Sequence, residues 1–183
     1  YLSILGASVN STNACLSSKA RAERILTESS VSSSILRVPM VLGTNDHAAR
    51  ALAKRASSTI AFAFRASSLE QPIDVDDVIA AVIACMESSI AGVMCLAGPA
   101  SLSRRVLFEC AGFRGVLISL PMWLGMTVAG LLEWASDNPP ITRAMLGVLD
   151  HDDDVDPATC VQKLGISLTS LDETLKKIAP SVD

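Results

Sequence analysis

The sequence predicts an α/β fold in which parallel strands form a sheet and helices cover it. Two observations support this prediction. Along the first 43 residues, an apolar strand-like run, a helical stretch and a second strand-like run follow one another with short joins. That order is typical of parallel, helix-covered sheets. The 183 residues are half apolar and 19% charged, so the chain is about one globular domain with a sizeable core.

The first three elements are each marked by a local pattern. Residues 1–5 form a short apolar strand, and a loop rich in Gly, Ser and Asn follows. Residues 14–29 repeat apolar side chains at helical spacing. The residues expected inside are Ala20, Ile25 and Leu26, and those expected in water are Arg21, Glu23, Arg24 and Glu28. A serine-rich turn then leads to a strand over residues 35–43, which Pro39 and Gly43 end.

The middle of the chain continues the alternation of strands and helices. Residues 47–56 indicate a short helix and residues 58–64 alternate as a strand does. Residues 73–75 are a short extended piece, and Asp74 or Asp76 is suited to cap the helix that runs from there to about residue 87. An aspartate at that position accepts bonds from free N–H groups and favours the helix dipole.

The last third of the chain has its own start and stop signals. After a strand and a Gly-Pro turn, Ser103 begins a helix that ends near Gly112. Residues 138–146 indicate a turn and a helix, and residues 150–157 form an acidic loop. Ser170 and Glu173 have the spacing of a capping box at the start of a final helix.

An uncharged stretch of 18 residues, 115–132, approaches the length of a membrane-spanning helix. Pro121 divides it, so we expect a strand followed by a helix. Gly125 and Gly130 are suited to close helix packing. Two alternatives stay open: a true membrane span, and docking of this apolar segment on a membrane or on a large partner.

Charge and cysteine content exclude some classes of protein. The net charge is −4 and the basic residues do not cluster, so nothing favours nucleic-acid binding. The five cysteines are scattered without a CxxC pair, which favours reduced thiols in an intracellular setting over disulfides or a zinc site. We therefore expect a cytoplasmic protein, with peripheral membrane association as the alternative, and no bound metal.

The acidic loop is the first place where a calcium site could be sought. Asp152, Asp154 and Asp156 alternate as in the start of a calcium-binding loop. The central glycine is absent, however, and the twelfth position holds Lys163 instead of glutamate. A solvated loop is the better interpretation.

Two further residue types are candidate nucleophiles or ligands. His47 and His151 are the only histidines, and neither has the spacing of a metal ligand. Cys15 lies near a helix start, where a thiolate is favoured, but no histidine lies near it in sequence. A small, partly buried thiol is the alternative interpretation of Cys15.

Lys19 lies where a parallel sheet binds its ligands. It follows a strand and a loop, on the first turns of a helix, at the carboxyl edge of the predicted sheet. An ammonium group there could bond ribose hydroxyls. The alternative is a solvated helix face shared with Arg21, Glu23 and Arg24.

Five segments in order resemble the second half of an extended or atypical short-chain dehydrogenase/reductase, of the NAD-dependent epimerase/dehydratase type. The segments are YLSILGAS (1–8), SSKARAE (17–23), SSSILRVPMVLG (32–43), PIDVDDVIAAV (72–82) and GVMCLAGP (92–99). Residues 119–175 resemble the NAD(P)H-binding accessory subunit of respiratory complex I.

The resemblance implies a division into two parts and a set of cofactor-binding residues. Residues 1–100 would be the second half of a Rossmann-type domain that binds NAD or NADP. Residues 101–183 would be a small, mostly helical subdomain for a substrate or partner. Ser3 would be the strand-end serine of the site, Lys19 would bond the nicotinamide ribose, and Pro39, Met40 and Val41 would line the nicotinamide. Arg37 would buttress that loop, and Asp74, Asp76 and Asp77 would serve capping and packing.

The chain departs from this family in two ways. Cys15 occupies the position of the catalytic tyrosine, four residues before Lys19, and a thiol is a weak hydrogen-bond donor. Tyr1 is the only tyrosine, and nothing in the sequence places it near Lys19. The glycine-rich turn that receives the pyrophosphate is also missing. We therefore expect the chain to be the later part of a longer protein and to bind a dinucleotide weakly by itself.

Three functions are compatible with these observations. The leading one is an NAD(P)-binding protein that holds the dinucleotide for a structural, sensing or assembly role. The second is an active NAD(P)-dependent reductase, or a sugar-nucleotide epimerase or dehydratase, whose proton donor would be Ser3, Cys15 or an ordered water. The third is a membrane-associated scaffold without a ligand.

Overall fold

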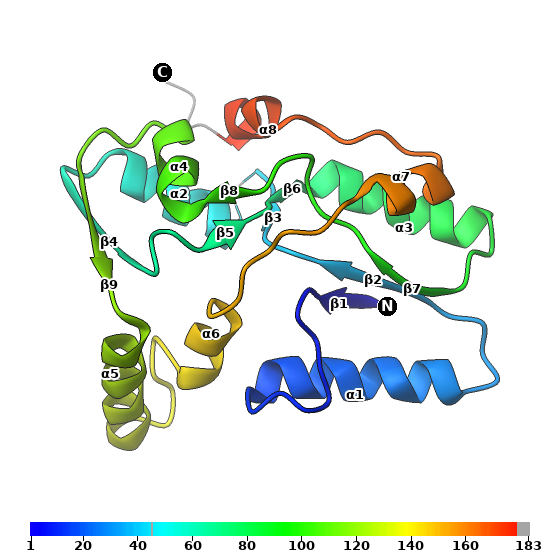
Figure 1. Cartoon of the computed structure of the whole chain (residues 1–183), viewed down its shortest axis with the longest axis horizontal. Coiled ribbons are helices and arrows are strands. Elements are labelled where there is room, and N and C mark those ends of the chain that lie inside the picture. The colour runs from blue at the N-terminus through cyan, green and yellow to red at the C-terminus, as the bar shows by residue number, and fades with distance from the viewer. Residues whose placement is uncertain (45, 179–183) are drawn as a thin grey trace.

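The computed structural model describes residues 1–44 and 46–178 and has the expected α/β architecture (Figure 1). Three parallel strands, β1 (Leu2–Ile4), β2 (Ser34–Val38) and β7 (Gly92–Cys95), form a sheet in the order β1-β2-β7. Leu2 pairs with Leu36 and Leu36 pairs with Met94, so the strands end at one edge. Within the described ranges, β1 pairs only with β2.

Helices cover both faces of this sheet. Helix α1 (Ala14–Glu28) lies below the strands in Figure 1, and helices α3 (Val75–Glu87) and α7 (Ala158–Leu164) lie above them. An apolar cluster fills the space between the strands and the upper helices; it includes Leu36, Val38, Val78, Ala81, Met94, Leu96, Cys160 and Leu164. Helix α7 was not expected from the sequence.

Helix α1 forms where the helical spacing of apolar residues predicted it, but a different face of the helix is buried. Asn13 caps its start by accepting bonds from the N–H groups of Cys15 and Leu16. Glu23, expected in water, is buried, while Ile25, expected inside, is exposed. The inward face follows Leu16, Ala20 and Glu23, and a carboxylate is tolerated there because a cation pairs with it.

The strand predicted over residues 35–43 is two strands that belong to different sheets. Pro39 follows β2 and has no N–H to continue the ladder. The chain then turns into β3 (Val41–Leu42), which pairs in parallel with β6 (Ile73–Asp74).

A second apolar cluster lies beside the first and joins distant parts of the chain. It packs α2 (His47–Ala56) and α4 (Arg104–Cys110) against β4 (Ile60–Phe64), which pairs with β9 (Val116–Leu120). Strand β5 (Leu69–Glu70) pairs antiparallel with β8 (Leu102–Ser103). The members of the cluster include Leu42, Leu52, Ala61, Leu107, Phe108, Leu117 and Leu175. Residues from both sides of position 100 share this core, and the predicted division at that position stays a prediction.

The uncharged segment folds as a strand and a helix, as Pro121 predicted. Helix α5 (Met122–Ala135) follows β9 directly. Among the described residues, no helix has both the length and the apolar character needed to cross a membrane. Gly125 packs closely, because a Cβ there would lie 2.7 Å from the Phe64 ring, whereas a Cβ at Gly130 would meet only Arg143 at 3.8 Å.

The predicted caps are confirmed. Asp74 caps α3 and also accepts bonds from Thr174 Oγ1 at 2.9 Å and Lys177 Nζ at 3.0 Å. Ser103 caps α4, and Ser170 and Glu173 form the capping box of α8 (Leu171–Ile178). Because Asp74 bonds to α8 as well as to α3, it holds α8 against β6 and the start of α3.

Candidate functional site

The carboxyl edge of the sheet opens into a small cavity. Ile4 lies at the end of β1, and Pro39 and Met40 follow the end of β2. These residues line a cavity of about 230 Å³ together with Glu70, Val148, Leu149, His151 and Asp153. The structure therefore brings Pro39 and Met40 to the strand edge, as expected. Val41 lies next to them in β3, paired with Ile73, and is not among the lining residues.

Ser3 is tied into a buried ion pair at the centre of β1. Its hydroxyl donates a hydrogen bond to Glu23 Oε1. Arg37 of β2 donates to the same carboxylate through Nε, 3.0 Å from Oε1, and through Nη2, 2.6 Å from Oε2. Burial pushes the pKa of Glu23 upward, but the hydrogen bonds from Arg37 and Ser3 outweigh it and leave that pKa below its ordinary value. The Ser3 hydroxyl is thus engaged with Glu23, and its role toward a cofactor stays a prediction.

Lys19 lies on the open edge of β1. Its ammonium group donates to the carbonyl of Leu2 at 3.1 Å and lies 5.2 Å from the centroid of the Tyr1 ring. The expectation that nothing places Tyr1 near Lys19 is wrong, because residues 1 and 19 meet through a cation–π contact. Cys15 is half-buried in the first turn of α1, where its N–H donates to the Asn13 side chain.

The acidic loop, residues 150–157, keeps Asp150, Asp152, Asp154 and Asp156 exposed, as expected of a solvated loop, but it is also bonded to the strand edge. Asp152 Oδ1 accepts bonds from Ser68 Oγ at 2.7 Å and from the N–H of Leu69 at 3.1 Å. Arg65 pairs with Asp150 at 3.0 Å and with Asp152 at 3.3 Å. Asp153 is buried, with 8% of its surface exposed. Charged and polar partners on β5 and the turn before it therefore fold the loop back onto the strand edge.

His151 is the functional candidate that the sequence analysis missed. Its Nε2 lies 3.0 Å from Oδ1 of Asp153, and its side chain is 27% exposed. The ring lies over Gly6, which has φ +74° and at which a Cβ would lie 3.2 Å from the imidazole. Contact with Asp153 raises the pKa of His151, although burial opposes this. The available signal was that His151, unlike His47, is followed directly by three aspartates.

Helix α6 (Arg143–Val148) anchors this histidine against the start of α1. The Asn13 amide donates to the carbonyl of Ala144 at 2.8 Å. Gly147 lets the two segments approach, because a Cβ there would collide with the Asn13 side chain. The same asparagine therefore caps α1 and fixes the segment that carries His151.

The residues at the edge fit one end of a dinucleotide. A cavity of about 230 Å³ is smaller than the ~300–1,000 Å³ typical of whole-ligand pockets, so it fits a single ring or a small substrate group. Both ring nitrogens of His151 and Oδ1 of Asp153 are buried without a well-formed hydrogen bond in the described residues. Such atoms suit a polar ligand. The part of the chain that the structure describes contains no cluster of three metal-ligating side chains.

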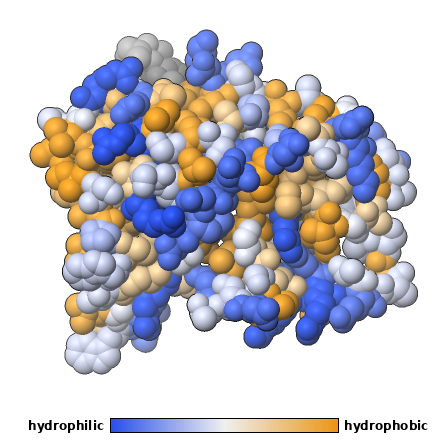
Figure 2. Space-filling view, viewed as in Figure 1, coloured by the Kyte–Doolittle hydropathy of each residue, from blue (hydrophilic) through white to orange (hydrophobic). Residues whose placement is uncertain are grey.

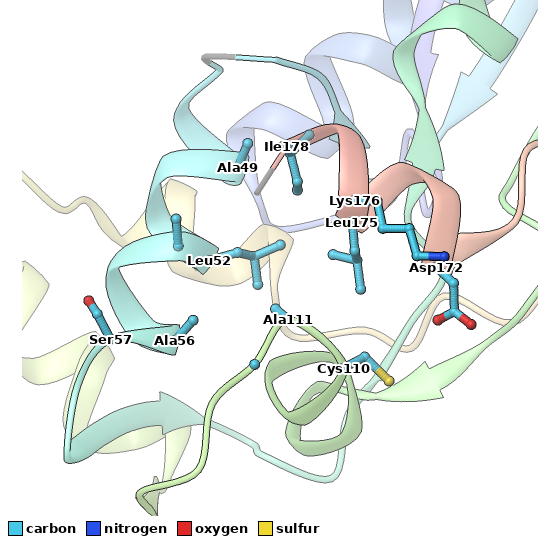
Figure 3. Close-up of a pocket in the computed structure, with 12 residues that line it drawn as sticks. Ala49, Leu52, Ala56, Ser57, Cys110, Ala111, Asp172, Leu175, Lys176 and Ile178 are labelled. Atoms are coloured by element: carbon cyan, nitrogen blue, oxygen red, sulfur yellow. The ribbon is translucent and has the colours of Figure 1, made fainter. Parts of the chain in front are cut away.

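A larger apolar pocket lies elsewhere, between α2, α4 and α8 (Figure 3). Its volume is about 440 Å³, and its walls are mainly alanine and leucine side chains such as Ala49, Leu52 and Leu175. Asp172 and Lys176 lie at its rim and do not converge with other polar groups on one point. Because a binding site needs such convergent polar groups, the smaller cavity at the strand edge is the stronger candidate.

Comparisons with known proteins identify the fold. No protein-family model and no curated protein sequence matches the chain. A human epimerase family protein, SDR39U1 isoform 2, solved with NADPH, matches with a TM-score of 0.70 at 16% identity, over 99% of this chain and 64% of its own. The UDP-N-acetylglucosamine 4-epimerase from Bacillus cereus matches at 0.65 and 12% identity, over 97% and 62%. RMD from Pseudomonas aeruginosa, complexed with NADPH, matches at 0.64 and 13%, over 97% and 64%.

These matches show the fold of the chain and its extent relative to known structures. The fold is α/β and Rossmann-type, with parallel strands between helices, and its structural neighbours include epimerases and proteins solved with NADPH. The chain spans less than two thirds of the length of each of these structures. At this level of identity the likeness defines architecture, and ligand and activity belong to the proposal that follows.

Proposed function

We propose that the protein binds NAD or NADP at the carboxyl edge of β1 and β2 and holds it for a structural, sensing or assembly role. The observation that carries this proposal is the cavity at the strand ends, lined by Pro39 and Met40, in a Rossmann-type sheet. In open α/β sheets, ligands bind outside the carboxyl ends of the strands. Two of the matched structures were solved with NADPH, which supports a dinucleotide as the ligand.

Each predicted residue has a distinct part in this proposal. Pro39, Met40 and Val41 would lie against the nicotinamide, and Lys19 would bond the ribose. Ser3 and Arg37 would act through Glu23, which they hold from both sides, and so fix the end of β1. Cys15 supplies a thiol where the resembling family has a phenol, which supports holding of the dinucleotide over the usual proton transfer.

Replacing Lys19 by methionine is expected to weaken NADPH binding by the native full-length protein. A charge-assisted hydrogen bond contributes about 1.5–3 kcal/mol, so the Kd should rise about 10-fold or more. Isothermal titration of NADPH into both proteins measures the change. Arg21→Met, on the exposed face of the same helix, is the matched control and should leave the Kd unchanged. Equal affinities for Lys19→Met and the unaltered protein would contradict the site.

An active enzyme is the second candidate function. It would be an NAD(P)-dependent reductase, or a sugar-nucleotide epimerase or dehydratase. One observation favours it: His151 and Asp153 place an acid–base pair in the same cavity as Pro39 and Met40. This pair could donate the proton that the family's tyrosine donates and that the thiol of Cys15 donates poorly.

A third proposal concerns a membrane-bound partner. Apolar side chains are exposed along β4, β9 and α5, at the left of Figure 2. Trp123 and Trp134 of α5 are 68% and 88% exposed. Tryptophans are favoured at protein and membrane interfaces. The resemblance of residues 119–175 to the accessory subunit of respiratory complex I suggests the partner to test, although the matched structures above give it no support.

The double variant Trp123→Gln/Trp134→Gln is expected to lower recovery of the native protein in the membrane fraction by about 10-fold. The reason is that two large aromatic contacts with the partner would be lost. Cell fractionation followed by immunoblotting measures this. Ile25→Gln removes an exposed apolar side chain from α1 and should change nothing. If the unaltered protein is absent from the membrane fraction, the partner proposal is wrong and cofactor binding is unaffected.

A further inference from the structure

We propose that His151, oriented by Asp153, is the proton donor of this site and acts on a small carbonyl substrate. The inference rests on the proposed cofactor site, since the bound NAD(P)H would supply the hydride. It extends the second candidate function, the active enzyme, by assigning a catalytic residue and a class of substrate.

The position of His151 is the first argument. The imidazole lies over Gly6, just beyond the end of β1, and lines the cavity that Pro39 and Met40 form beyond the end of β2. Gly6 has a positive φ of +74°, and the absence of a side chain there leaves room for the ring. The histidine, which belongs to the acidic loop, therefore lines the same cavity as the segment expected to hold the nicotinamide.

The environment of the ring is the second argument. Asp153, 3.0 Å away, is the nearest charge, and Glu70 of β5 also faces the cavity, although Arg104 of α4 pairs with it. Asp150 and Asp152, on the same loop, are paired with Arg65. The segments at Gly6, Pro39–Met40 and Val148 contribute no charge. This surplus of negative charge favours the imidazolium form near neutral pH, which is the form that can give up a proton.

The remaining candidates for the proton donor are weaker. The Ser3 hydroxyl is buried and donates to Glu23. The Cys15 thiol is a weak hydrogen-bond donor. The ring nitrogens of His151 and Oδ1 of Asp153, in contrast, have no well-formed hydrogen bond within the described ranges although they are buried. Because Nε2 and Oδ1 face each other at 3.0 Å, Nδ1 is the buried polar atom for which a ligand would complete the network.

The proposed step is balanced by the groups named. When bound, NAD(P)H would supply the hydride that the carbonyl carbon of an aldehyde or ketone accepts. The carbonyl oxygen takes the proton from the ring N–H that does not face Asp153. The products are the alcohol, NAD(P)⁺ and a neutral imidazole, which regains its proton from water. A cavity of about 230 Å³ favours a small carbonyl group over a bulky one.

The test uses the native full-length protein and three variants: His151→Gln, Asp153→Asn and, as the matched control, His47→Gln at the only other histidine, which is exposed on α2. Three quantities are measured for each. They are the Kd for NADPH, the pH titration of the histidine Cε1–H resonances with and without NADPH, and NADPH oxidation with a panel of small aldehydes and ketones.

We expect all four proteins to bind NADPH with Kd values within about 2-fold of one another. NADPH should shift the resonance of His151 and leave that of His47 unmoved. His151→Gln should lower the oxidation rate by about 100-fold or more, and the unaltered rate should fall as pH rises through the pKa of His151. Asp153→Asn should move that fall to lower pH.

Two results would overturn the inference while the proposed cofactor site stands. One is NADPH binding that leaves the His151 resonance unmoved. The other is NADPH binding with no oxidation of the panel, or with equal oxidation by His151→Gln and the unaltered protein. Failure of the unaltered protein to bind NADPH would overturn the proposed function itself, and the binding measurement separates that result from the other two.

Discussion

Replacing Arg104 by methionine is expected to lower the free energy of unfolding by about 3–5 kcal/mol, because it leaves the Glu70 carboxylate buried without its cation. The two side chains are only 8% and 7% exposed. Arg104 Nε donates to Glu70 Oε1 at 2.8 Å, and the same guanidinium also reaches the carbonyl of Phe64. Urea denaturation measures the loss. Arg105→Met, at the exposed neighbour on the same helix, is the control and should cost less than about 0.5 kcal/mol.

The loss should also depend on pH. Burial already raises the pKa of Glu70 above its ordinary value, although Arg104 opposes this, and removal of Arg104 raises that pKa further. A carboxyl whose pKa is higher in the folded state binds more protons when folded, so stability falls as pH rises. The destabilisation of Arg104→Met should therefore be smaller at about pH 5 than at about pH 8. A loss that matches that of Arg105→Met would contradict the importance of this ion pair.

Replacing Arg37 by methionine is expected to lower the free energy of unfolding by about 2–3 kcal/mol. This loss is smaller than that of Arg104→Met because water reaches part of the Arg37–Glu23 pair. The Arg37 side chain is 28% exposed and that of Glu23 is 6% exposed. Among the described residues, the variant leaves the Glu23 carboxylate with only the Ser3 hydroxyl as a hydrogen-bond donor from another side chain. Urea denaturation of Arg37→Met, of Glu23→Gln and of the double variant gives the coupling energy.

Arg24→Met is the matched control for this second prediction. Arg24 pairs with Glu28 on the exposed face of α1 at 3.7 Å, so its loss should change stability by less than about 0.5 kcal/mol. The pH dependence has the opposite sign from that of Glu70. The pKa of Glu23 is lowered in the fold, so the pair stabilises the protein above the unfolded-state pKa and loses this effect as pH falls through the folded-state pKa. A coupling energy near zero would contradict the prediction.

Local signals predicted most of the helices and caps. The cap at Asp74, the Ser103 cap and the capping box of Ser170 and Glu173 all form where the sequence places them. Each depends on residues within three or four positions, which a sequence displays directly. The one strand predicted over 35–43 became two because Pro39 ends pairing with β1 and β7, and the partner of the next segment, β6, lies about 30 residues further on.

The candidate site was only partly predictable, for a related reason. Pro39 and Met40 were expected at the strand edge from the family resemblance, and they line the cavity there. Glu23 looked solvated because its partner Arg37 lies on another element. The bonds between the acidic loop and the strand edge could not be predicted, because its partners Arg65 and Ser68 lie far from it in sequence. Without those partners in view, His151 had no visible neighbour other than its own aspartates.

The distance in sequence between the acidic loop and its partners has a consequence for how the protein folds. The bonds from Arg65, Ser68 and Gln71 to residues 150–155 each close a loop of 83 to 87 residues. Closing so long a loop costs chain entropy before any contact forms. Helix α1 and its cap require only neighbouring residues. The helix that carries Lys19 can therefore form early, and the segment that carries His151 docks late, so the strand edge is complete only in the last stage of folding.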